Sequence, residues 1–314
     1  MLYLEYVPWK LLFTAYIGLT VYSVVRPYAL PTHIAFYPRL SAYCAFVFLA
    51  AATALVTAPY ALYYRHDPTF INWVFLQTLY FLSHKALGIN VVVTGHENLP
   101  PFYHTYVMVS NHQSGLDLVW LAKACPRKAI GVAKDTLKYI PLIGQALQLA
   151  GTVFIDRGSS KESIAKFQEL SREMHHSGTP VLVFPEGTRD HAKTIGMLSF
   201  KKGAFHLAVQ AHAPIVPIVV ANMSNVFHRP SLVFKPGTIR VQILPPVETT
   251  HKKTAEDVNE LAHNTWNMMI AAMKKMPPMG EQIRDLDDLS DNAGAADILA
   301  AIAADMAHET ARAA

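Results

Sequence analysis

His112 and Asp117 form a pair that could carry out acid–base chemistry. An imidazole accepts a proton near neutral pH, and a nearby carboxylate can hold its tautomer and orientation. Gln, Ser, Gly and Leu separate the two residues. On a continuous helix, positions five apart point about 140° away from each other, because each residue turns the chain by about 100°. The pair therefore predicts a turn in which the two side chains meet.

The residues around this pair predict a strand, a loop and a helix. The run YVMVS (residues 106–110) is rich in strand formers, and the apolar run LVWL (residues 118–121) follows the polar stretch. Ser114 and Asp117 have the spacing of a helix N-cap and its N3 carboxylate. Asp117 is thus expected to cap the helix, to orient His112, or to do both. For His112 the plain alternative is a surface loop histidine, since the chain contains 15 histidines.

A second polar group, with the sequence PEGTR, lies in a Pro/Gly loop after another apolar run. Glu186, Thr188 and Arg189 would there present a carboxylate, a hydroxyl and a guanidinium to a polyol phosphate. Arg157 follows an earlier apolar run in the same way. Guanidinium groups bind phosphate through two parallel hydrogen bonds. The alternative for Arg157 is a surface salt bridge with Asp156 or Glu186.

Short apolar runs alternate with helical patterns from residue 89 to residue 250. This alternation is typical of an α/β domain, in which we expect a mixed sheet flanked by helices. Pro217 favours a strand start or a sheet edge, because proline lacks the amide N–H. Open α/β sheets bind ligands beyond the carboxyl ends of their strands, where the polar residues above should collect. The predicted strands cover residues 91–93, 106–110, 130–134, 152–155, 181–184, 215–220 and 239–244.

The most apolar part of the chain precedes this domain. The chain is 52% hydrophobic and 16% charged, which is more apolar than an average soluble domain. Residues 40–64 carry no charge and exceed the roughly 20 residues that a helix needs to cross a bilayer. Residues 11–25 form a shorter segment that either spans with a tilt or lies flat. Residues 70–87 predict a helix that lies either in the domain core or in the membrane interface.

These patterns divide the chain into four parts. Residues 1–88 hold the membrane-anchoring helices, preceding the α/β domain of residues 89–250. Thr254 is expected to cap a C-terminal helix within residues 251–278. Residues 279–314 are expected to form a loosely ordered tail, because they offer charge and alanine but few large apolar anchors. Arginines flank the long apolar segment on both sides, so its direction across a membrane stays open.

Several functional classes fit the sequence poorly. Lys and Arg number 27 against 23 Asp and Glu, an excess of four, and no basic stripe interleaved with aromatic residues indicates nucleic acid binding. A serine nucleophile elbow, a P-loop and a dinucleotide-binding G-x-G-x-x-G are absent from the sequence. The two cysteines lie far apart and the histidines lack metal-ligand spacing. We therefore expect no disulfide and no metal site.

Four sequence blocks resemble, in order and spacing, those of the glycerolipid acyltransferases. They are NHQSGLD (residues 111–117), GTVFIDR (151–157), FPEGTR (184–189) and VPIV (216–219). Two further segments, TLKYIP (136–141) and FKKGAF (200–205), look most like eukaryotic 1-acylglycerol-3-phosphate acyltransferases. The resemblance covers residues 91–247. Four ordered blocks are far more specific than a lone His-x4-Asp motif.

The resemblance implies a reaction for the His/Asp pair. His112 would take the proton from the sn-2 hydroxyl of lysophosphatidic acid as that oxygen attacks the thioester of acyl-CoA, while Asp117 holds the imidazole. Acyl-CoA is then a co-substrate and no other cofactor is expected. The implied setting is an integral membrane protein of the endoplasmic reticulum. Two alternatives stay open: an acyltransferase for glycerol 3-phosphate or a lysophospholipid, and an inactive membrane lipid-binding protein.

The resemblance also implies which residues bind substrate. Arg157, Glu186 and Arg189 match positions assigned to the glycerol phosphate, and Lys134 looks placed to join them. Backbone amides near Gly187 are candidates for donors to the thioester oxyanion. The full expected binding set is Lys134, Arg157, Glu186, Gly187, Thr188 and Arg189.

Overall fold

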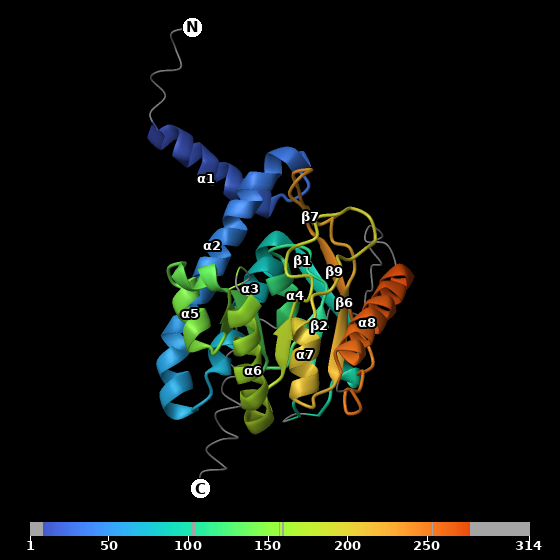
Figure 1. Cartoon of the computed structure of the whole chain (residues 1–314). Coiled ribbons are helices and arrows are strands. Elements are labelled where there is room, and N and C mark those ends of the chain that lie inside the picture. Colours follow the sequence, from blue (N-terminus) through green and yellow to red (C-terminus); the bar gives the residue numbers. More distant parts are fainter. Residues whose placement is uncertain (1–8, 102–103, 157, 159, 253, 277–314) are drawn as a thin grey trace. The chain divides into compact units, whose positions relative to one another are not determined.

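A seven-stranded mixed sheet organises the protein in a computed structural model that describes residues 9–101, 104–156, 158, 160–252 and 254–276 (Figure 1). The strand order is β1-β9-β6-β2-β5-β3-β4. The strands are β1 (Ile89–Thr94), β2 (Val107–Ser110), β3 (Ile130–Lys134), β4 (Val153–Ile155), β5 (Val181–Val183), β6 (Ile215–Val220) and β9 (Gly237–Ile243). A separate hairpin joins β7 (Phe227–His228) and β8 (Val233–Phe234).

Strand direction divides the sheet into two parts. β6, β2, β5, β3 and β4 run parallel to one another, whereas β9 pairs antiparallel with β6 and parallel with β1. The carboxyl ends of β2, β5, β3 and β4 consequently share one edge of the sheet, where such folds bind ligands. The predicted α/β class with a mixed sheet flanked by helices is confirmed.

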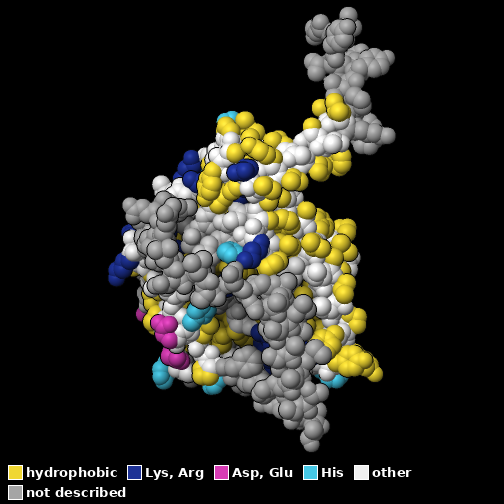
Figure 2. All heavy atoms as spheres, turned by 180° about the vertical axis from the view of Figure 1, so that it is seen from behind, with side chains coloured by type: hydrophobic (Ala, Val, Ile, Leu, Met, Phe, Trp, Pro, Cys, Tyr) yellow, Lys and Arg dark blue, Asp and Glu magenta, His cyan; other side chains and the backbone are white. Residues whose placement is uncertain are grey.

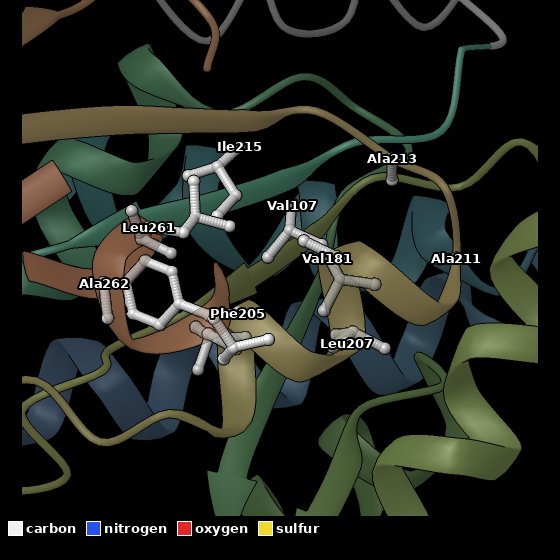
Figure 3. Packing of buried hydrophobic residues seen from close by; sticks show 14 of the residues in the cluster. Val107, Val181, Phe205, Leu207, Ala211, Ala213, Ile215, Leu261 and Ala262 are labelled. Carbon is white, nitrogen blue, oxygen red and sulfur yellow. The ribbon is translucent and has the colours of Figure 1, made fainter. Parts of the chain in front are cut away.

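Three helices cover one face of the sheet. They are α6 (Ser160–Ser177), α7 (Gly203–Gln210) and α8 (Ala255–Lys275), and they pack on β4, β2 and β6 respectively. Their core contains Val107, Val181 and Ile215 from the strands against Phe205 and Leu261 from the helices (Figure 3). Burying such side chains gains about 1.5–3 kcal/mol each, so this core fixes the strands that carry the site. As expected, Thr254 caps α8, through a capping box with Asp257.

The remaining helices bring the N-terminal part onto the sheet. α3 (Thr69–Leu87) packs on β1 and on α4 (Asp117–Ala124), and it buries Phe70, Ile71 and Leu79. Of the two alternatives for this segment, the structure shows a core helix. The connecting elements are η2 (His96–Asn98), η3 (Asp135–Tyr139) and α5 (Ile143–Leu149).

α2 (Thr32–Pro59) continues into a π-helix, η1 (Tyr60–Tyr64), and follows α1 (Trp9–Val25). Residues 32–64 form one helix long and apolar enough to cross a membrane by length and composition, whereas α1 is shorter. One side of α2 buries small and aromatic residues against α3, α5 and β8, among them Phe36, Ala50 and Ala54. The opposite side leaves large apolar side chains exposed.

The expectation for Pro217 was wrong, because β6 is an interior strand between β9 and β2. The regular ladder to β9 begins only at Ile218, after an isolated bridge between Ile215 and Val247. Pro217 falls in this gap and still contributes its carbonyl, which accepts a hydrogen bond of 2.9 Å from the Leu244 amide. An interior proline is tolerated here because the ladder has shifted register at that residue.

Candidate active site

The turn between β2 and α4 brings His112 and Asp117 together. His112 Nδ1 lies 2.6 Å from Asp117 Oδ2. A carboxylate only accepts hydrogen bonds, so the hydrogen resides on Nδ1 and leaves Nε2 as a basic lone pair. In the part of the chain that the structure describes, Nε2 has no protein partner, and the His112 side chain is 15% exposed. The geometry is that of an oriented general base.

Asp117 is buried and also orders the turn. Its Oδ2 accepts hydrogen bonds from the amides of Gln113 (2.9 Å) and Ser114 (3.0 Å), and its Oδ1 accepts one from Trp120 Nε1 (3.1 Å). Ser114 was expected to be the N-cap of the helix, but the N-cap is Leu116, α4 begins at Asp117 and no side chain caps it. The carboxylate points back to the amides of Gln113 and Ser114 and holds the turn closed.

Two aromatic side chains support the imidazole. The Phe184 ring stacks on His112 with centroids 4.2 Å apart, and Trp120 meets Phe184 edge-on at 6.3 Å. This wall restricts the rotation of the imidazole and shields one of its faces from water. Neither residue was expected at the site. Their positions in the sequence could have indicated this role, since Trp120 follows Asp117 by three residues on the same helix and Phe184 directly precedes the Pro-Glu-Gly turn.

The end of β6 anchors the same turn from another side. Asn111 donates to the Val220 carbonyl at 3.0 Å and accepts from the Val220 amide at 2.8 Å. Gln113 donates to the carbonyls of Val220 and Ala221 and accepts from the Met223 amide at 2.9 Å. Two amide side chains thus lock the turn to a strand about 110 residues further along the chain, a role that local spacing does not reveal.

A third anchor comes from α2. The hydroxyl of Tyr43 donates a hydrogen bond of 2.7 Å to the carbonyl of Gly115, inside the turn. Tyr43 is buried, and the next amide, that of Leu116, donates to Ser114 Oγ at 3.0 Å. The Gly115–Leu116 peptide is therefore held at both ends. Through this contact an N-terminal apolar helix belongs to the scaffold of the His/Asp pair.

Glu186 supports the backbone of His112. Its Oε1 accepts from the His112 amide at 2.7 Å and its Oε2 from the Leu198 amide at 2.8 Å, and only 3% of the residue is exposed. Burial raises the pKa of Glu186 to about 7, against the opposing effect of the two amide hydrogen bonds. The geometry gives Glu186 a positioning role; direct contact with substrate stays a prediction.

Three of the other expected binding residues lie at or after the carboxyl ends of two neighbouring strands. Thr188 and Arg189 are exposed in the loop after β5, and Lys134 is exposed at the end of β3, in register with Ile155 of β4. Arg157 lies outside the described residues. The exposed cations are suitably placed at the sheet edge for a phosphate, and their contact with a ligand stays a prediction.

Of the backbone amides near Gly187 that were considered as oxyanion donors, that of Gly187 itself is engaged within the turn. Its N–H donates to the Phe184 carbonyl at 3.1 Å, which closes the Pro-Glu-Gly turn. Gly187 has φ +71°, and an added Cβ would lie 2.9 Å from Cε of Lys201. The positive φ requires glycine here, whereas the flexible Lys201 side chain could move away from a Cβ. The Lys201 stem covers the turn and brings a cation to it, which sequence reasoning had not assigned.

Comparisons with known proteins agree with this geometry. Residues 90–221 match the family model described as Acyltransferase, so fold and site define an acyltransferase. A 1-acyl-sn-glycerol-3-phosphate acyltransferase of Saccharomyces cerevisiae is 37% identical over 205 residues, 65% of this chain and 67% of the relative. The alpha form from Mus musculus is 38% identical over 210 residues, 67% of this chain and 72% of the relative.

The chain belongs to the 1-acyl-sn-glycerol-3-phosphate acyltransferase family, and the resemblance seen in its motifs is confirmed. The fold is also that of a solved structure, the 1-acyl-sn-glycerophosphate (LPA) acyltransferase PlsC from Thermotoga maritima. That match has a TM-score of 0.58 and 21% identity, and covers 85% of this chain and 99% of the other.

Proposed function

We propose that this protein transfers an acyl group from acyl-CoA to the sn-2 hydroxyl of 1-acyl-glycerol 3-phosphate, giving phosphatidic acid. The observation that carries the proposal is the contact of 2.6 Å between His112 Nδ1 and Asp117 Oδ2, which leaves Nε2 as the base. Family membership supports the choice of acceptor, because the relatives are named for that substrate.

In the proposed reaction, Nε2 of His112 accepts the hydroxyl proton as the oxygen attacks the thioester carbonyl. The tetrahedral intermediate collapses, the C–S bond breaks, and the imidazolium returns the proton to the leaving thiolate. Asp117 stabilises the transient imidazolium and keeps the ring aligned. The thioester is already an activated acyl group, so the step as written needs no further cofactor. Arg157, Arg189 and Lys134 would bind the phosphate of the acceptor.

The proposed location is a membrane, with the endoplasmic reticulum as the compartment expected from the resemblance. Support comes from α2 with η1, whose length and composition suit a bilayer, and from its exposed apolar side. Fractionation of cells that express the full chain, with carbonate washing of the membranes, tests this. Recovery of the protein in the soluble fraction would contradict it.

The test of activity is the transfer of labelled acyl groups from acyl-CoA to a panel of acceptors. The panel contains 1-acyl-glycerol 3-phosphate, glycerol 3-phosphate and lysophosphatidylcholine. We expect transfer to the first, and about a 10²- to 10⁴-fold loss of kcat in His112→Ala, the usual range for a general base. The exposed His263 on α8 supplies the matched control His263→Ala. Full activity in His112→Ala would overturn the mechanism, and preference for another acceptor would overturn the substrate.

A further inference from the structure

η3 and α5 form a compact unit, residues 135–149, which we call the η3–α5 hairpin. The Gly144 amide donates to the Ile140 carbonyl at 2.7 Å, and Gln148 Nε2 donates to the carbonyls of Lys138 (3.2 Å) and Gly144 (3.1 Å). Gly144 permits the close approach, since a Cβ there would lie 2.1 Å from the Lys138 carbonyl oxygen. The shape of the hairpin is thus set by its own hydrogen bonds.

The hairpin directs large apolar side chains outward. Tyr139, Leu142 and Leu149 are 73%, 43% and 40% exposed. Leu142 also has φ +63°, a positive value that is unfavourable for a leucine. A defined backbone that exposes three large apolar side chains indicates a surface with a partner.

The neighbouring helix identifies that partner. α5 packs against α2, whose outer side exposes Leu49 (50%) and Val56 (81%), with Tyr63 (74%) following in η1. Figure 2 shows hydrophobic side chains gathered along the side of the molecule that the N-terminal helices form. The hairpin therefore extends an apolar surface whose length and composition suit a lipid bilayer.

Cations border the apolar side chains. Lys134 is exposed directly before the hairpin, and the Lys138 ammonium lies 5.0 Å from the centre of the Tyr139 ring. A hydrogen bond from Lys138 to Asp135 raises the pKa of Lys138, so this group stays charged. Lysine and tyrosine beside exposed leucines are the combination found at the level of lipid headgroups.

We propose that the η3–α5 hairpin is a membrane-contact surface, in which Tyr139, Leu142 and Leu149 enter the interfacial region of the bilayer and Lys134 and Lys138 face anionic headgroups. The hairpin begins where β3 ends, at the edge of the sheet that carries the site. If the proposed function holds, the acyl chain of the acceptor stays in the bilayer while its phosphate reaches Lys134.

Fluorescence quenching by lipids tests the surface without any need for activity. The full chain carries Cys44→Ala and Cys125→Ala, and a single fluorophore is attached at Leu142→Cys or, separately, at Leu149→Cys. Leu49→Cys on α2 is the positive control, and exposed Asn259→Cys on α8 is the negative control. The vesicles contain phosphatidylcholine, phosphatidylglycerol and a spin-labelled lipid.

We expect the fluorophores at residues 142 and 149 to be quenched as strongly as the one at residue 49. Quenching no stronger than at residue 259 would overturn the proposal. In a second arm, Tyr139→Ser with Leu142→Ser should lower turnover of a long-chain acceptor in vesicles several-fold and leave a short-chain, water-soluble acceptor unaffected. An equal loss with both acceptors would contradict the membrane role. Absence of all acyl transfer would overturn only the proposed function.

Discussion

At the scale of single residues, Asp117 shows how one carboxylate can serve structure and chemistry together. Three donors converge on Oδ2 and one on Oδ1, from the His112 ring, two turn amides and the Trp120 indole. Hydrogen bonds to a charged acceptor are stronger than neutral ones, so this buried carboxylate fixes the turn before substrate arrives. The imidazole needs little reorganisation during proton transfer.

Replacement of Asp117 by Asn should separate these roles. An amide offers one acceptor oxygen, so it cannot accept from both the turn amides and the Trp120 indole without turning an N–H₂ toward a donor. His112 would lose its tautomer and alignment. We expect kcat to fall about 10²- to 10⁴-fold with a smaller change in KM. Steady-state kinetics measures this; a change confined to KM would contradict the orienting role.

Glu186 gives the protein a specific pH dependence. Its folded pKa of about 7 lies above the ordinary value of 4.5, so the folded chain binds more protons than the unfolded chain between these values. The free energy of unfolding should therefore decrease as pH rises from about 4.5 to 7, by at most about 3 kcal/mol, and stay lower above pH 7.

Glu186→Gln should remove this contribution, because a carboxamide does not titrate. Denaturant unfolding of the full chain in detergent at pH 5, 6, 7 and 8 compares the slopes of wild type and variant. The exposed Glu256 provides the control Glu256→Gln, which should keep the wild-type slope. Equal slopes in wild type and Glu186→Gln would show that the carboxylate titrates near its ordinary pKa.

At the scale of elements, α2 acts on the site through Tyr43. Tyr43→Phe leaves the Gly115 carbonyl buried without its donor, at a cost of about 1–3 kcal/mol. We expect a several-fold lower kcat with little change in KM, because the turn that holds His112 loosens. The exposed Tyr37 on the same helix gives the control Tyr37→Phe. If both variants kept full activity, the hydrogen bond would have no part in positioning the turn.

Element types were largely predictable from the sequence, and element ends were less so. The apolar runs at residues 130–134 and 215–220 became β3 and β6 with the same bounds, because β-branched residues between turn formers favour strands. The N-cap of α4 was misplaced by two residues, at Ser114 instead of Leu116, because Ser114 lies in the turn that the Asp117 carboxylate holds. The prediction that Pro217 marks a strand start or a sheet edge was wrong, because local sequence rules do not show where the β6–β9 ladder shifts register.

At the scale of the whole molecule, the site depends on contacts that sequence spacing does not reveal. The His112 amide meets Glu186 across 74 residues, and Gly115 meets Tyr43 across 72. Spacing identified His112 and Asp117 because five residues can close one turn. The sequence motif placed Glu186 in the correct loop but indicated that it contacts substrate. In the structure, both of its carboxylate oxygens accept hydrogen bonds from backbone amides.

Arg39 connects the N-terminal helices to the α/β unit. Its guanidinium is fully buried in α2, donates to the Ser23 carbonyl at the end of α1 (3.0 Å) and to the Leu87 carbonyl at the end of α3, and lies 5.4 Å from the centre of the Phe234 ring. Three helices and the β7–β8 hairpin thus meet on one side chain. A buried charge is tolerated only with such partners.

Arg39→Met should therefore loosen the N-terminal helices as a group. The apolar side chain fills similar space but leaves the Ser23 and Leu87 carbonyls without donors, at about 1–3 kcal/mol each. We expect a lower Tm and faster chymotryptic cleavage after the exposed Tyr28, between α1 and α2. Arg39→Lys, which keeps a charge and can reach one carbonyl, should lie between wild type and Arg39→Met. Cleavage of Arg39→Met at the wild-type rate would show that α1 is held in place without this arginine.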